Sequence, residues 1–227
     1  MKALAIALAL AAIASVGHCQ TSAALTPWVS MSEADTELFW REASGPNGER
    51  DAAALPLYRA VFAHDRQAAA KLLDGGASPN LLLFQNRWSV LMAATAYQDT
   101  DMIDLLSHHG ANIDYVSNDP AAYTALGVAL NAALGDALRN DSTKRDFRTF
   151  NHLLDLGAEI NVVFHDEDIV MFAATLGQMD LVNDLLARGY RRDLAGLNEI
   201  LKIMHVDEKT EPEKQKAILS IRRLQRT

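Results

Sequence analysis

The amino-acid sequence predicts an all-α fold, a solenoid of about four helix–turn–helix repeats with helical caps at both ends. The first observation is a leucine followed four residues later by a glycine, which recurs at Leu72–Gly76, Leu106–Gly110, Leu153–Gly157 and Leu185–Gly189. The second is an apolar block upstream of each pair, with equivalent positions Leu57, Leu91, Leu126 and Val170. These positions are 34, 35 and 44 residues apart, a period typical of an array of small supersecondary units.

Each leucine–glycine pair is expected to end the second helix of a repeat. The leucine lies one helical turn before the end and packs against the neighbouring repeat. The glycine adopts the left-handed conformation that a Cβ disfavours. Small residues allow the paired helices to approach closely, and these are Ala60, Ala94, Ala129 and Ala173. The pairs and the four upstream positions are therefore predicted to be structural.

The third repeat is longer than the others. Its closing Gly157 comes about a dozen residues late, which indicates an insertion near residues 134–145, between the two helices. The cluster Asn140-Asp141-Ser142-Thr143 favours a turn. We expect a surface loop here, and a loop that contacts a partner is the alternative.

The repeated pattern resembles the ankyrin repeat. That family opens one helix with Thr-Pro-Leu-His and closes a second with Leu-Leu-x-x-Gly-Ala, which Leu55-Pro56-Leu57-Tyr58 and Leu72-Leu73-Asp74-Gly75-Gly76-Ala77 match, followed by Pro79-Asn80. The resemblance covers residues 52–193. It divides them into repeats at 55–88, 89–123, 124–167 and 168–193. It implies an ankyrin-repeat solenoid.

The N-terminal residues 1–19 have the pattern of a secretory signal peptide. Lys2 is followed by an apolar stretch from Ala3 to Val16, which is too short for a comfortable membrane span. A cut before Gln20 or near Ala23 fits. Lipid anchoring at Cys19 stays an alternative, although the residue before it is His18 and not a small residue.

Cysteine usage and charge indicate the compartment and the class of partner. Cys19 is the only cysteine, so the mature domain has no disulfide, and we expect the periplasm of a Gram-negative bacterium. Without residues 1–19 the chain has 20 basic and 29 acidic residues, or −9. This charge disfavours nucleic acid and fits a basic protein partner, unless it serves solubility alone. We expect a monomer with no stable membrane span.

Residues on both sides of the repeats are expected to cap them. The segment 20–51 contains a helix start at Ser32-Glu33-Ala34-Asp35. The segment 194–227 contains two predicted helices, Leu194–Val206 and Glu213–Gln225. Basic residues on the second helix are interpreted as a solvated outer face that also favours the helix dipole.

Catalytic chemistry is not expected, and no cofactor or resident metal is predicted. The sequence has none of the common catalytic motifs. His108 and His109 are adjacent and diverge on a helix, and His64 occupies a turn position that is usually glycine in the resembled family. His165, Asp166 and Asp168 form the alternative from another class, a metal-binding or hydrolytic module.

The loops that precede the first helices are predicted to contact a partner, as the projecting fingers of ankyrin proteins do. Whether the apolar segment Leu81–Phe84 is an interface or is buried under the N-terminal cap stays open. Aromatic, acidic and amide side chains in these loops, together with Tyr97, are typical of an interface with a few anchors. The predicted contact residues are Phe84, Arg87, Trp88, Tyr97, Asp114, Tyr115, Asn118, Phe164, His165 and Asp166.

The resemblance and the export signal together imply a non-enzymatic binding protein. Exported bacterial ankyrin proteins include immunity proteins that inhibit a secreted antibacterial toxin, and this role is the expectation. Periplasmic accessories of a catalase in oxidative-stress protection are the alternative. The gene adjacent to this one would separate the two.

Overall fold

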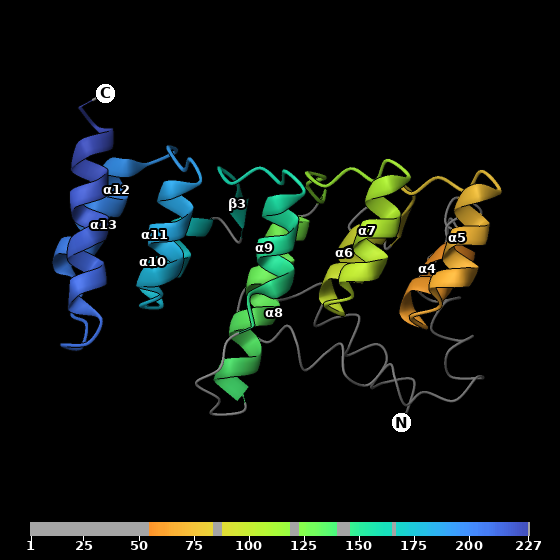
Figure 1. Ribbon diagram of the computed structural model, residues 1–227, viewed down its shortest axis with the longest axis horizontal. Helices are drawn as coiled ribbons and strands as arrows, with labels where there is room; N and C mark the ends of the chain where they lie inside the picture. The colour runs from red at the N-terminus through yellow and green to blue at the C-terminus, as the bar shows by residue number, and fades with distance from the viewer. Residues whose placement is uncertain (1–54, 84–87, 119–122, 140–145, 165–166, 227) are drawn as a thin grey trace. The chain divides into compact units, whose positions relative to one another are not determined.

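The computed structural model describes residues 55–83, 88–118, 123–139, 146–164 and 167–226 (Figure 1). The predicted signal peptide and N-terminal cap lie outside these ranges. The described chain is almost entirely helical, with two short hairpins, and the predicted all-α class is confirmed at that level. It divides into two compact units, one ending at Ala158 and the other beginning at Glu159. None of the described helices has both the length and the apolar composition needed to cross a bilayer.

The first unit consists of three helix pairs in chain order. Its elements are α4 (Leu55–Phe62), α5 (Arg66–Asp74), β1 (Leu82–Leu83), β2 (Trp88–Ser89), α6 (Val90–Ala96), α7 (Thr100–His108), α8 (Ala125–Arg139) and α9 (Arg148–Asp155). The first helix of each pair packs against its own partner and against the first helix of the next pair, so that α6 contacts α4, α7 and α8. The core of this unit therefore runs through the first helices.

The second unit contains one further helix pair and two C-terminal helices. Its elements are β3 (Val163–Phe164), β4 (Glu167–Asp168), α10 (Ile169–Thr175), α11 (Met179–Ala187), α12 (Leu194–Ile203) and α13 (Glu211–Leu224). Helix α10 packs against α11 and α12, and α13 packs against α11 and α12. The two helices expected beyond residue 193 are thus present as α12 and α13.

The four leucine–glycine pairs form one recurring hydrogen-bonded closure. Each glycine has a left-handed backbone, with φ of +94°, +85°, +94° and +113° for Gly76, Gly110, Gly157 and Gly189. The residue after each glycine donates its N–H to the carbonyl of the leucine at 3.0 Å, as Ala111 does to Leu106. This 6→1 bond defines the Schellman motif, which uses carbonyls that the helix end would leave unpaired. We name this feature the leucine–glycine closure.

The predicted core positions are buried with one exception. Leu57, Leu91, Leu126, Val170, Leu106, Leu153 and Leu185 are almost completely buried, as are Ala60, Ala94, Ala129 and Ala173. Leu72 is only half-buried, and its neighbour Leu73 is buried in its place. At the end of α5 the more deeply buried side chain is therefore that of Leu73.

The extra residues of the third repeat begin as helix. Helix α8 continues to Arg139, so residues 134–139 extend it by more than one turn of 3.6 residues. A surface loop over these six residues was the wrong expectation. The turn-favouring cluster begins only at Asn140, and residues 140–145 lie outside the described ranges. Nothing before Asn140 stops the helix, since a single Gly135 is tolerated in its interior.

The turn between the two helices of a repeat requires a left-handed residue. His64, Gln98 and Gly177 occupy this position with φ of +53°, +55° and +69°. His64 thus takes the backbone conformation of the glycine expected at its position. A side chain with a Cβ costs about 1–2 kcal/mol in this conformation, so His64 and Gln98 are local sources of strain.

We expect Leu106→Ala to destabilise the protein by about 2–5 kcal/mol, because Leu106 is completely buried and its removal leaves a cavity. Leu72→Ala is the matched control, and its loss should be clearly smaller because Leu72 is half-buried. Urea denaturation followed by circular dichroism measures both. A loss below about 1 kcal/mol for Leu106→Ala would contradict its place in the core.

Exchanging residues at the left-handed turn should change stability in opposite directions. We expect Gln98→Gly to stabilise the protein by about 1 kcal/mol and Gly177→Ala to destabilise it by about the same amount. A Cβ on Gly177 would have no atom within 4 Å, so the cost is conformational and not a clash. Thermal unfolding of the two variants measures the effect. Stabilisation by alanine at residue 177 would disprove the conformational explanation.

Candidate functional site

Two hairpins project before the first helices of their repeats. In β1–β2, Leu82 pairs with Ser89 and Leu83 with Trp88; in β3–β4, Val163 pairs with Asp168 and Phe164 with Glu167. The tips, residues 84–87 and 165–166, lie outside the described ranges, and with them Phe84, Arg87, His165 and Asp166. Phe164 is described as a strand residue only. The predicted fingers therefore begin and end as paired backbone.

The second finger, which is the loop between helices α7 and α8, exposes both polar and apolar side chains. Asp114 and Asn118 are exposed and Tyr115 is half-buried, while Val116 between them is 51% exposed. The base of the finger is closed by Ser117, whose N–H donates to the Tyr123 carbonyl at 2.8 Å and whose hydroxyl accepts from the Tyr123 N–H at 2.7 Å. The sequence reasoning missed Val116, although an apolar residue inside a polar finger is itself a signal.

Trp88 and Tyr97, both predicted to contact a partner, take part in packing. The Tyr97 ring meets the rings of Phe62 and His64 edge-on, with centroids 5.2 and 5.1 Å apart, and burial raises its pKa. The Trp88 carbonyl accepts a hydrogen bond from the Tyr58 hydroxyl, and its ring lies 6.2 Å from that of Tyr123. Both are half-buried, so their exposed edges alone are available to a partner.

Histidine–aspartate pairs join neighbouring helix pairs of the first unit. His64 Nδ1 lies 2.7 Å from Asp99 Oδ2. His152 Nε2 lies 2.7 Å from Asp104 Oδ1. His109 Nε2 is 3.6 Å from Asp74 Oδ1, and His108 Nδ1 is 3.1 Å from the Asp104 carbonyl. These four imidazoles are therefore engaged in contacts within the chain.

An asparagine four residues after the closing glycine binds the loop of the next repeat. Asn80 donates from Nδ2 to the Gly110 carbonyl at 3.0 Å and accepts the Asn112 N–H at 2.7 Å. In the second unit, Asn161 accepts the Arg191 N–H through Oδ1 at 2.9 Å. The same position thus serves the same purpose in both units.

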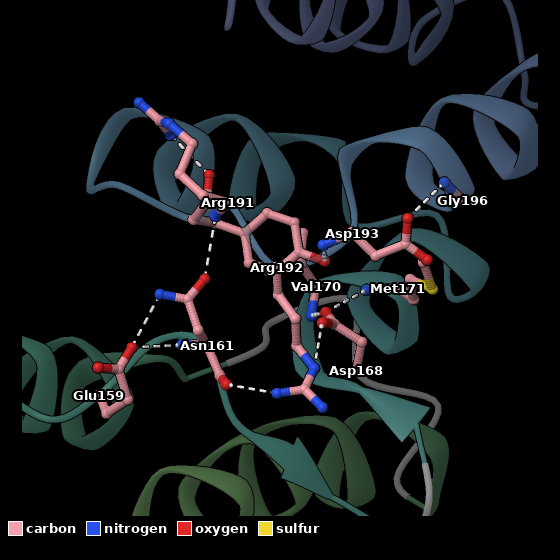
Figure 2. Close-up of polar contacts among 10 residues, drawn as sticks. Glu159, Asn161, Asp168, Val170, Met171, Arg191, Arg192, Asp193 and Gly196 are labelled. Carbon is pink, nitrogen blue, oxygen red and sulfur yellow. Dashed lines mark hydrogen bonds and ion pairs between the residues drawn. The ribbon is translucent and has the colours of Figure 1, made fainter. Parts of the chain in front are cut away.

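Asp168 is the centre of a polar cluster in the second unit (Figure 2). Its Oδ1 accepts the N–H of Val170 at 2.9 Å, which caps helix α10, and its buried Oδ2 lies 3.7 Å from Arg192 Nε. Ser89 and Thr124 cap the first helices of their repeats from the equivalent position. Asp168 is thus the cap of its repeat, with an ion pair added.

The surrounding contacts join residues 159–161 to the residues that follow the closing Gly189 and to the start of helix α12. Arg192 Nη1 donates to the Asn161 carbonyl at 3.2 Å, and the Tyr190 hydroxyl accepts the Asp193 N–H at 3.1 Å. Burial, and then the nearby Asp168 carboxylate, raises the pKa of Tyr190. Hydrogen bonds from Asn161 to Glu159 lower the pKa of the Glu159 carboxyl. Each of these contacts fixes backbone.

Of the three residues in the metal-binding alternative, Asp168 alone is described. Its two carboxylate oxygens face the α10 N-terminus and Arg192. No group of three histidine, cysteine, aspartate or glutamate side chains gathers within the described residues. The described geometry thus gives Asp168 a capping role.

The comparisons with known proteins assign no family to the chain. No protein-family model matches it, and a search of curated proteins finds no similar sequence.

Substitutions of Asp168 should separate capping from charge. Asp168→Ala is expected to cost about 1–2 kcal/mol because it removes the α10 cap. Asp168→Asn should cost clearly less, since asparagine caps equally well. Ser89→Ala is the control for a cap without an ion pair, and urea denaturation measures all three. If asparagine were as costly as alanine, the position would require the negative charge, as a cation ligand does.

Proposed function

We propose that the chain is a non-enzymatic ankyrin-repeat protein that binds another protein in the periplasm. The helix pair with its leucine–glycine closure occurs in all four repeats, and the hairpin and the asparagine that binds the next repeat are each described twice, which supports the ankyrin assignment. The signal-peptide pattern of residues 1–19 supports export.

The observation that carries the binding proposal is the distribution of side chains between framework and surface. His64, His109, His152 and Asp168 contact other parts of the repeats. The second finger instead exposes Val116, with the exposed Asp114 and Asn118 two residues before and after it. An exposed apolar residue with a polar rim is typical of a protein interface.

The partner we propose is a secreted antibacterial toxin, which the chain inhibits as an immunity protein. The net charge of −8 supports a basic partner, because opposite charge speeds encounter. A periplasmic accessory of a catalase is the alternative within the binding class. A toxin gene or a catalase gene beside this one distinguishes them.

A metal-binding or hydrolytic module using His165, Asp166 and Asp168 is the alternative from another class. Asp168 is the last residue of strand β4, and His165 and Asp166 lie outside the described residues. Elemental analysis of the purified protein, with melting curves in calcium and zinc, tests this alternative directly.

The binding proposal is tested on the protein encoded beside this chain. We expect Tyr115→Ala combined with Phe164→Ala to weaken affinity for that partner at least about tenfold, since aromatic anchors carry much of an interface's energy. Calorimetry on the full mature chain measures Kd. Ile203→Ser, which removes a 73% exposed apolar side chain in α12, is the control and should leave Kd unchanged. Unchanged affinity in the double variant would refute the placement of the interface.

A further inference from the structure

The charge of the chain is reversed in its last residues. Residues 214–227 contain five basic residues and no acid, a charge of +5, so the preceding 213 residues carry −8 − 5 = −13. The five are Lys214, Lys216, Arg222, Arg223 and Arg226. All but Arg226 lie within helix α13. This basic segment therefore stands out from an acidic chain.

Most other cations of the second unit have a partner. Arg188 pairs with Asp184, Arg192 with Asp168, and Lys202 with Glu199. Lys214 and Lys216 pair with Glu211 and Glu213 in the first turn of α13. Arg222, Arg223 and Arg226 are exposed and form no ion pair with any described residue. Three guanidinium groups are thus exposed to solvent within five residues.

Two of these arginines, Arg222 and Arg223, share one face of helix α13 with an exposed leucine. Ala217, Ile218 and Ile221 are buried, and α13 packs against α11 and α12. Leu219 is 51% exposed, and it precedes Arg222 and Arg223 by three and four residues, which is the spacing of a single helical face. Arg226 follows two residues after the end of the helix. We name Leu219, Arg222, Arg223 and Arg226 the arginine face.

The helix dipole favours cations in the last turn of α13 and explains a part of this arrangement. It does not account for the exposed Leu219, which lies before the last turn. Three adjacent guanidinium groups also repel one another, so their grouping costs stability that an anionic partner would restore.

We propose that the arginine face docks an acidic segment of another protein. Guanidinium groups bind carboxylates through paired hydrogen bonds, and Leu219 adds an apolar contact beside them. A membrane surface fits less well, because the apolar face of α13 is already buried in the second unit and a membrane-bound helix needs that face. Nucleic acid fits less well, because an extended polyanion would also meet the rest of the chain, which carries −13, whereas a short acidic segment can contact the arginines alone. The proposal does not depend on the finger surface.

The experiment measures binding of the full mature chain to a fluorescent glutamate-rich peptide that contains one leucine, by anisotropy at low and physiological salt. We expect saturable binding that weakens with salt, since exposed charges are screened over about 8 Å at physiological ionic strength. Arg222→Gln, Arg223→Gln and Arg226→Gln together should weaken it about tenfold or more. Leu219→Ser should weaken it further.

The matched control removes three charges elsewhere, with Lys71→Gln, Lys202→Gln and Lys209→Gln, and should bind nearly as the parent does. Far-ultraviolet circular dichroism and melting curves check that all variants fold, since none of the substituted side chains belongs to the core. Absent binding, or equal loss in the control, would overturn the proposal. Tighter binding to phosphatidylglycerol vesicles or to single-stranded DNA than to the peptide would also overturn it.

Discussion

The leucine–glycine closure is the interaction on which the rest of the structure depends. In each repeat a left-handed glycine lets the following N–H reach the leucine carbonyl, and in all four repeats that bond is 3.0 Å long. The chain leaves the helix in the same direction each time, so each loop begins in the same geometry. In three repeats the side chain of that leucine is completely buried, which couples the end of the helix to the core.

Polar side chains fix the helix starts and the loops that follow the closure. Ser89, Thr124 and Asp168 cap the first helices, and Asn80 and Asn161 bind the loop of the following repeat. Buried polar groups need such partners, because an unpaired one costs about 1–3 kcal/mol. Exposed pairs such as His64–Asp99 add about 0–1 kcal/mol each. The buried caps Ser89, Thr124 and Asp168 therefore matter more to stability than the ion pairs between repeats.

The sequence predicts the features that depend on residues close together in the chain. The closing glycines and the buried leucines follow from local spacing, and the turn at His64 from the family resemblance. The His64–Asp99 and His152–Asp104 pairs join residues 35 and 48 positions apart, and no periodicity indicates them. The late Gly157 indicates how many residues are inserted but not where the insertion leaves the helix, and α8 continues to Arg139, just before the turn cluster that starts at Asn140. Of the proposed site, Asp114 and Asn118 are exposed as expected, while Trp88 and Tyr97 also pack against their neighbours.

Some side chains hold the repeats together and others lie on the surface, and this difference limits where function can lie. A side chain that fixes a helix end or a loop cannot change without a cost in stability, and this holds for the closing leucines, the caps and the asparagines. Val116 and the arginine face have no such duty in the described structure, since neither is buried. Exposed apolar and unpaired charged groups gain nothing from folding, yet both gain from a partner that covers them. The residues that specify what this chain binds are therefore those that its fold does not require.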